Sequence, residues 1–99
     1  MSLTTDPHEG CLHEIGQDGQ QKCYLILPDG ERKDLARAVR ISYKHQVCGA
    51  ITTMNRAIAE TYAADPAFYD ATYCAVCRAH FPVGENGEFT WLDGSKVGT

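Results

Sequence analysis

Two short groups of histidine and cysteine residues carry the metal chemistry that this sequence can support. The first group is His45-Gln46-Val47-Cys48-Gly49, and the second is Cys74-Ala75-Val76-Cys77. Each group places two nitrogen or sulfur donors three positions apart, and zinc takes four such donors in a tetrahedron. We therefore predict one structural Zn²⁺ ion, the ligands of which are His45, Cys48, Cys74 and Cys77.

The fourth ligand is the least constrained member of this set. His80 follows the second group at the same spacing and could replace His45, and Cys23 is a further candidate. Cys11 and His13 form another donor group near the N-terminus together with Cys23. That group could supply one ligand or, with His80, a second site. We place His45 first because it completes the first metal-binding turn.

Two other interpretations of the cysteines are open. They could be small buried residues with His45 on the surface, or they could form a disulfide framework. The odd total of five cysteines and the lack of an apolar signal segment favour metal ligation. On the same grounds we expect a reducing, cytoplasmic setting.

The length of 99 residues predicts one small domain, in which residues 1–10 form a flexible N-terminal segment and residues 11–99 form a single zinc-binding domain. A hydrophobic content of 43% is enough for a core, and a structural metal would add to its stability. The sequence has no run approaching the ~20 apolar residues of a membrane span, so we expect no membrane partner.

Charge is unevenly distributed along the chain. The net charge of −4 argues against a protein whose main task is to coat nucleic acid, because such domains are usually basic. Residues 31–48 nevertheless carry five basic residues against two acidic ones. This basic stretch could contact phosphates or an acidic partner, or it could be a solvated face.

The spacing of apolar residues predicts an α+β fold, a small zinc-ribbon-like domain of short antiparallel hairpins with one main helix over about residues 53–64. Apolar and small residues recur there at the spacing of one helix face, at Met54, Ala57, Ile58, Thr61 and Tyr62. Thr52 or Thr53 is expected to cap the helix start, and Asp65-Pro66 is expected to end it.

Strands are predicted over residues 22–27, 39–44, 71–73, 81–83 and 88–92. Pro28-Asp29-Gly30 is typical of a turn and predicts a returning strand from Glu31, whereas Asn86-Gly87 predicts a hairpin between the last two strands. Phe89 and Trp91 would share one strand face. They are expected to pack in the core near the metal, with a base-stacking platform as the alternative.

The second half of the chain carries a longer series of motifs. These are Cys48-Gly49, Thr52-Thr53-Met54, Ala59-Glu60-Thr61-Tyr62-Ala63-x-Asp65-Pro66-x-Phe68-Tyr69, Ala71-Thr72-Tyr73-Cys74-x-x-Cys77-x-x-His80-x-Pro82-Val83, Glu88-Phe89-x-Trp91 and Val97-Gly98-Thr99. With them, residues 48–99 resemble a family of small zinc-ribbon-like proteins encoded by phages and prophages. The resemblance implies a phage-type metal-binding protein whose cysteines and His80 belong to one pattern, and it implies no particular activity. Asp70 stands where that pattern has glycine.

The sequence does not contain the motifs of catalytic zinc. His13-Glu14 lacks the second histidine of H-E-x-x-H, and the residues before Cys74 do not match the zinc deaminase signature. We therefore expect no enzyme and no catalytic residue. The function we predict is a structural-zinc interaction module with a protein partner. A nucleic-acid-binding zinc ribbon is the alternative, and a metal- or thiol-dependent enzyme is less favoured.

Overall fold

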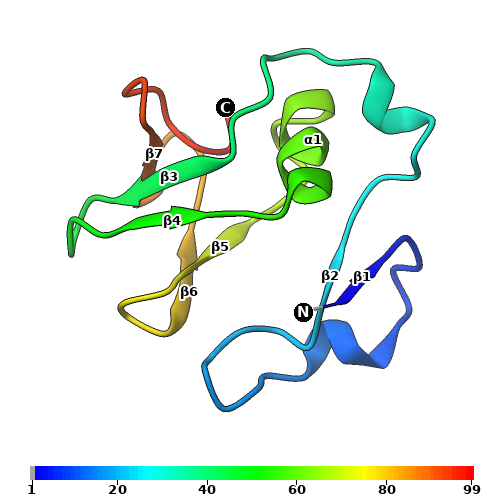
Figure 1. Ribbon diagram of the computed structural model, residues 1–99, viewed down its shortest axis with the longest axis horizontal. Coiled ribbons are helices and arrows are strands. Elements are labelled where there is room, and N and C mark those ends of the chain that lie inside the picture. Colours follow the sequence, from blue (N-terminus) through cyan, green and yellow to red (C-terminus); the bar gives the residue numbers. More distant parts are fainter. Residues whose placement is uncertain (1) are drawn as a thin grey trace.

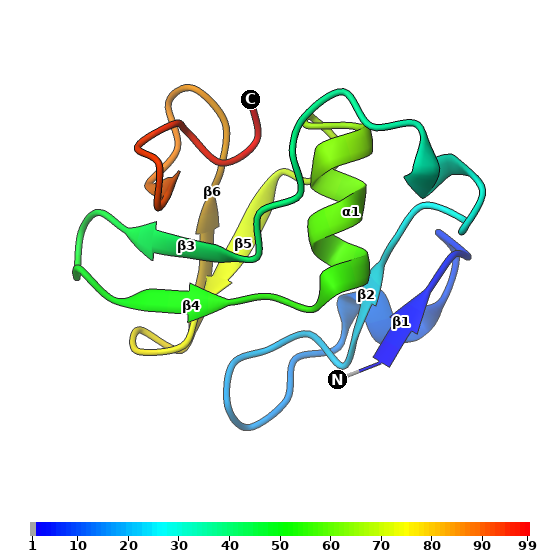
Figure 2. The same cartoon turned by 45° about the horizontal axis from the view of Figure 1, so that its top comes forward.

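The computed structural model describes residues 2–99 as three small sheets and one α-helix (Figures 1 and 2). The elements in chain order are β1 (Ser2–Thr4), η1 (Gly10–His13), β2 (Cys23–Leu25), η2 (Glu31–Lys33), β3 (Ser42–His45), β4 (Ile51–Thr53), α1 (Arg56–Ala64), β5 (Ala71–Cys74), β6 (Ala79–Pro82) and β7 (Phe89–Trp91), where η marks a 3-10 helix. The predicted α+β class with one main helix is confirmed. Among residues 2–99, every helix falls short of the length and apolar character that a membrane span requires.

The helix α1 begins slightly later than the sequence predicts. Asn55 is its N-cap, because the Asn55 side-chain oxygen accepts a hydrogen bond of 2.8 Å from the backbone N–H of Ala57. Thr52 and Thr53 were expected to cap the helix, but they belong to β4, where the backbone is extended. The helix ends at Ala64, before the Asp65-Pro66 pair, as predicted.

Strand β3 is the centre of a three-stranded antiparallel sheet with the order β4-β3-β7. Strands β5 and β6 form a separate antiparallel pair. The predicted hairpin between residues 81–83 and 88–92 is therefore wrong, since β6 pairs with β5 and β7 pairs with β3. The pairing with β3 sets Trp91 opposite Tyr43 and Phe89 opposite His45, and this register buries both aromatic rings of β7.

The core lies between this sheet, α1 and the β5-β6 pair. It contains Ile26, Tyr43, Ile58, Tyr62, Cys74, Phe89, Trp91 and Val97, all buried. The rings of Phe89 and Trp91 each meet Tyr43 edge to face, with centroids 5.3 and 6.4 Å apart. The expectation that Phe89 and Trp91 pack in the core is confirmed, and their burial leaves no surface platform for stacking bases.

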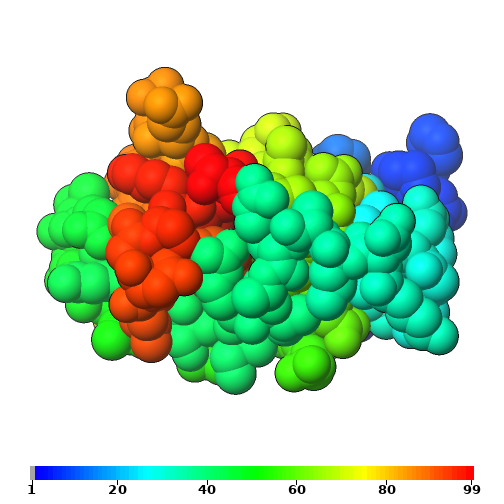
Figure 3. All heavy atoms as spheres, turned by 90° about the horizontal axis from the view of Figure 1, so that it is seen from above, coloured from blue at the N-terminus to red at the C-terminus, as the bar shows by residue number. Residues whose placement is uncertain are grey.

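The segment after β2 does not return as a strand. Residues Glu31–Lys33 form the 3-10 helix η2, so the hairpin expected at Pro28-Asp29-Gly30 is wrong. The cause is Arg32, whose guanidinium binds the Leu27 carbonyl oxygen at 2.7 Å and the Glu60 carboxylate at 3.1 Å. These contacts hold the segment against α1. The chain then crosses the face shown in Figure 3, where the segment after η2 lies beside the C-terminal segment. Arg40 Nη1 donates there to Asp93 at 3.2 Å and to Ser95 at 2.8 Å.

The N-terminal segment is joined to β2 by covalent and hydrogen bonds. Strand β1, which lies in the segment expected to be flexible, pairs in parallel with β2. A disulfide links Cys11 to Cys23, so Cys23 is not available as the fourth ligand and Cys11 does not belong to a second metal site. Disulfides persist mainly in oxidising compartments, and this one therefore gives no support to the expected cytoplasmic location.

The same segment packs against the turn between β5 and β6. The Tyr73 hydroxyl donates to the Asp18 carbonyl oxygen, and the Tyr24 hydroxyl lies 2.9 Å from His80 Nε2. Gly19 has a φ of +87°, and a Cβ atom there would lie 2.0 Å from the carbonyl oxygen of Arg78. Only glycine fits this contact, which fixes the N-terminal segment against the second metal-binding turn.

Candidate metal centre

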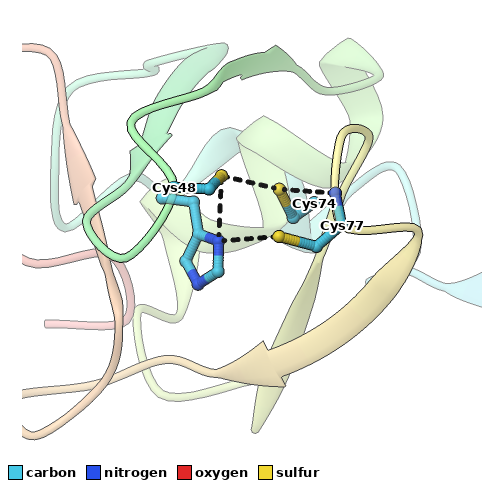
Figure 4. Close-up of side chains that lie close together, drawn as sticks. Cys48, Cys74 and Cys77 are labelled. Carbon is cyan, nitrogen blue, oxygen red and sulfur yellow. Dashed lines mark hydrogen bonds between the residues drawn. The ribbon is translucent and has the colours of Figure 1, made fainter.

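Two tight turns bring the predicted ligands to one point (Figure 4). The turn between β3 and β4 carries His45 and Cys48, and the turn between β5 and β6 carries Cys74 and Cys77. One donor atom from each of these residues lies within 4.8 Å of the other three. The first ligand of each turn is buried and the second is exposed. This cluster can hold a metal ion.

The two turns have the same backbone geometry. The N–H of Gly49 donates to the His45 carbonyl oxygen at 2.7 Å, and the N–H of Arg78 donates to the Cys74 carbonyl oxygen at 2.8 Å. Both donors have positive φ, 77° for Gly49 and 56° for Arg78. The positive φ expected after Cys48 is therefore present. Arg78 adopts the same left-handed conformation, although the sequence has no glycine there.

The spacing of the donor atoms suits a tetrahedral zinc ion. Zn–S bonds of about 2.3 Å and Zn–N bonds of about 2.0–2.1 Å place two sulfurs about 3.8 Å apart and a sulfur and a nitrogen about 3.6 Å apart. The Sγ atoms of Cys48 and Cys74 are 3.5 Å apart. Nδ1 of His45 lies 3.3 Å from the sulfur of Cys48 and 3.6 Å from that of Cys77. A single ion therefore fits between these donors.

The imidazole of His45 is held in one orientation from three sides. It is 1% exposed and packs against the rings of both Phe81 and Phe89, with centroids 4.5 and 4.7 Å away. Its Nε2 lies 2.9 Å from a carboxylate oxygen of Glu88. When the Nε2–H group donates this hydrogen bond to the carboxylate, Nδ1 carries the lone pair that faces the sulfurs. The fourth donor is therefore oriented before any ion binds.

The pKa values of Cys48 and Cys77 are shifted in opposite directions. The backbone N–H of Ala50 donates to the sulfur of Cys48 and, with weaker hydrogen bonds from neighbouring side chains, lowers the pKa of that thiol to about 7. Partial desolvation of its sulfur, together with hydrogen bonds to Cys48 and Cys74, raises the pKa of Cys77 to about 11. Several thiolates this close repel one another. A divalent cation removes that repulsion and lets the remaining thiols ionise.

The pKa of His45 is raised by its partners. Burial alone would lower it, but the hydrogen bond to Glu88 and those to the sulfurs of Cys48 and Cys74 outweigh burial. These hydrogen bonds favour the protonated, positively charged imidazole. A bound cation would occupy the place of the proton on Nδ1, so acidification is expected to compete with metal binding.

The remaining candidate ligands lie elsewhere. His80 points to Tyr24 on the side of β6 that faces the N-terminal segment, and its burial lowers its pKa. Cys11 and Cys23 form the disulfide, and His13 is exposed at the end of η1. Among residues 2–99, the cluster of possible metal ligands includes His45 and does not include His80.

Glu88 is a residue of this centre that the sequence pattern did not identify. It lies in no ligand motif, and it reaches His45 only because β7 pairs with β3. A carboxylate at the start of a predicted strand gives no signal of its own unless the strand pairing is known. Its role follows from a general rule, since metal-binding histidines usually donate their second ring N–H to a carboxylate or carbonyl.

No family model matches this chain, and neither the curated proteins nor the solved structures contain a significant match. The resemblance of residues 48–99 to phage proteins therefore stays a prediction.

Glu88→Gln is expected to weaken metal binding by about 10- to 100-fold. The amide keeps the size of the side chain but removes the negative charge that favours the His45 tautomer with a free Nδ1. The dissociation constant is measured by competition with a chromophoric zinc chelator. Glu85→Gln is the matched control, because Glu85 is exposed in the preceding loop. Equal affinities of the two variants would contradict the assigned role of Glu88.

Proposed function

We propose that this chain is a small structural-zinc interaction module of phage or prophage type, which docks on a protein partner. The observation that carries the proposal is the closed donor set, in which two rigid turns direct one imidazole nitrogen and three sulfurs to the same point. Three thiolates and an imidazole suit zinc better than magnesium or calcium, which prefer oxygen.

The donor set also argues against zinc catalysis. Catalytic zinc usually has three protein ligands and keeps one position for water or substrate. Here four side chains would occupy a tetrahedral ion, and His45 and Cys74 are buried. The chemistry of a bound zinc would then be structural, because it links β3 and β4 to β5 and β6 through the two turns.

The turns themselves supply a docking surface. Val47 and Val76 directly precede the second ligand of each turn, and they are 74% and 69% exposed. Ile51 of β4 is 61% exposed at the start of the strand after the first turn. Single exposed apolar residues are common, but these three lie in or next to the two turns that carry the ligands. A surface of this kind suits an apolar protein patch.

The nucleic-acid alternative is less favoured because much of the basic stretch is neutralised within the fold. Arg32 pairs with Asp29 and Glu60, Lys33 with Asp29, and Arg40 with Asp93. Among residues 2–99, only Arg37 and Lys44 of this stretch lack an acidic partner within 4.0 Å, and phosphate binding usually needs a larger unpaired set. Docking on a protein is therefore favoured over binding of nucleic acid.

Val76→Asp is expected to abolish partner binding without loss of zinc. The test is affinity capture from the native host with the wild-type chain, Val76→Asp and Leu92→Asp as baits. Leu92 is also 61% exposed but lies after β7, away from the turns, and it serves as the matched control. A partner retained by the wild type and Leu92→Asp but lost from Val76→Asp supports the proposal.

Two outcomes would contradict the docking proposal. One is a partner that Val76→Asp retains at wild-type affinity. The other is binding of labelled DNA or RNA whose affinity falls steeply with salt, because that dependence is the mark of phosphate contacts. Zinc content and melting temperature of each bait are measured first, so that loss of folding is not mistaken for loss of docking.

A further inference from the structure

A cavity of about 230 Å³ lies on the side of β5 that faces α1. Its walls come from β4, α1, β5 and the N-terminal segment that packs on the second metal turn, elements that lie side by side in Figure 2. The floor is made by buried residues, among them Tyr43, Ile58 and Thr72. Thr53 and Ala71 at its mouth are exposed. The cavity is thus a pocket that opens to solvent.

Every tyrosine of the chain lines this pocket. The sequence contains five, and all five contribute to the walls: Tyr24, Tyr43, Tyr62, Tyr69 and Tyr73. They come from β2, β3, α1, β5 and the loop before β5, so no local motif explains their convergence. Tyrosine rings offer flat apolar faces, and such faces prefer other aromatic rings.

Hydrogen bonds to other parts of the protein hold most of these rings in place. The hydroxyl of Tyr69 donates to the Leu25 carbonyl oxygen at 2.5 Å, and that of Tyr43 donates to the Tyr73 carbonyl oxygen. The Tyr24 and Tyr73 hydroxyls bind His80 and the backbone of the N-terminal loop, as described above. The aromatic walls are therefore ordered before a ligand arrives, which lowers the cost of binding.

The other side chains around the pocket define the polarity of its occupant. None of the described residues that line it is Asp, Glu, Lys, Arg or His. Thr52, Thr72, Asn55 and Gln20 add hydroxyl and amide groups that donate and accept hydrogen bonds. A charged ligand would lose its hydration without compensation, and a purely aliphatic one would make no use of the donors and acceptors that these groups have left after their hydrogen bonds within the fold.

We propose that this pocket binds an uncharged heteroaromatic molecule of nucleobase size. The partly exposed rings of Tyr24 and Tyr69 contact the ligand ring above the buried floor of Tyr43, Tyr62 and Tyr73. The threonine, asparagine and glutamine groups take its ring nitrogens, carbonyls and amino groups. At ~30 Å³ per water molecule the volume corresponds to about eight waters, which is room for one ring or two fused rings without a phosphate. The proposal does not rest on the docking surface described above.

The test is a titration of the metal-loaded protein with adenine, uracil and orotate, followed by NMR signals of the tyrosine rings. Orotate is uracil with a carboxylate, so it keeps the ring and adds a charge. The expected result is saturable shifts of the tyrosine signals with adenine or uracil, at least tenfold weaker with orotate. Failure of both neutral bases to bind at millimolar concentration, or equal binding of orotate, would overturn the proposal.

A variant that fills the mouth of the pocket assigns the binding site. Ala71→Trp is expected to weaken binding of the neutral base at least tenfold, whereas Ala67→Trp, at an exposed alanine outside the pocket, should leave it unchanged. Zinc content and melting temperature show whether each variant is folded. Thr53→Trp, from the opposite wall, replaces Ala71→Trp if that variant does not fold. Unchanged binding in the folded mouth variant would contradict the site.

Discussion

Cys74→Ser is expected to lose the bound metal and most of the folded structure. The Cys74 side chain is fully buried, and its sulfur accepts a hydrogen bond of 3.5 Å from the N–H of Cys77. Serine offers a poor ligand to zinc and would leave a polar hydroxyl in an apolar core. In structural sites the metal-binding free energy, about 10–16 kcal/mol in zinc-finger peptides, is also folding free energy.

Elemental analysis and thermal melting of the purified variant measure both effects. The expected result is less than a tenth of the wild-type metal content and no cooperative transition. The control is the double variant Cys11→Ser/Cys23→Ser, which removes the two cysteines of the disulfide. It should lose about 3 kcal/mol of stability and keep its metal. A Cys74→Ser protein with wild-type metal content and melting temperature would refute the site.

Phe89→Ala is expected to lower the free energy of unfolding by about 3–5 kcal/mol, the usual cost of removing a large buried ring. Phe89 is 0% exposed, stacks on the His45 imidazole and meets Tyr43 edge to face. A cavity at this position would destabilise the core and also release one side of the ligand. The loss is a large share of the 5–15 kcal/mol typical of a small domain.

Chemical denaturation of the metal-loaded protein, with the chelator competition used for Glu88→Gln, measures both consequences. Phe68→Ala is the control, because Phe68 is only half-buried and contacts Tyr69 away from the metal centre. The control should be clearly less destabilised and should bind metal with wild-type affinity. If Phe89→Ala loses stability but binds metal as tightly as Phe68→Ala, the coupling between the core and the ligand orientation is refuted.

The metal-ligand cluster could be predicted from the sequence because its pattern of donors lies within two short segments. Two donors three residues apart on a tight turn are already neighbours, and two such turns suffice for one tetrahedral ion. The helix was accessible for the same reason, since its apolar stripe and its end at Asp65-Pro66 are features of adjacent residues. The structure brings His45, Cys48, Cys74 and Cys77 together as those patterns indicate.

The features that were missed depend on contacts between distant segments. The strand β7 could have paired with β6 through the Asn86-Gly87 turn, but pairing with β3 buries Phe89 and Trp91. That register is also what carries Glu88 to His45. Neither the partner strand of β7 nor its register can be predicted from the sequence of β7 alone, because register depends on which face of the strand is buried.

The disulfide and the tyrosine pocket were missed for a related reason. Cys11 and Cys23 are close in sequence, but their spacing equally suited metal ligands, and the odd cysteine count argued against a disulfide. The tyrosines are spread over half of the chain and follow no common period. Their convergence follows from the packing of α1, β5 and the N-terminal segment, which only the folded chain reveals.

The metal content of protein purified without chelator, with thiol titration before and after EDTA, tests the central claim most directly. We predict about one zinc per chain and three thiols, those of Cys48, Cys74 and Cys77, that react only after chelation. The disulfide cysteines should stay unreactive throughout. Protein without metal, whose three free thiols react at once while the fold is intact, would contradict the structural zinc site and the proposed function built on it.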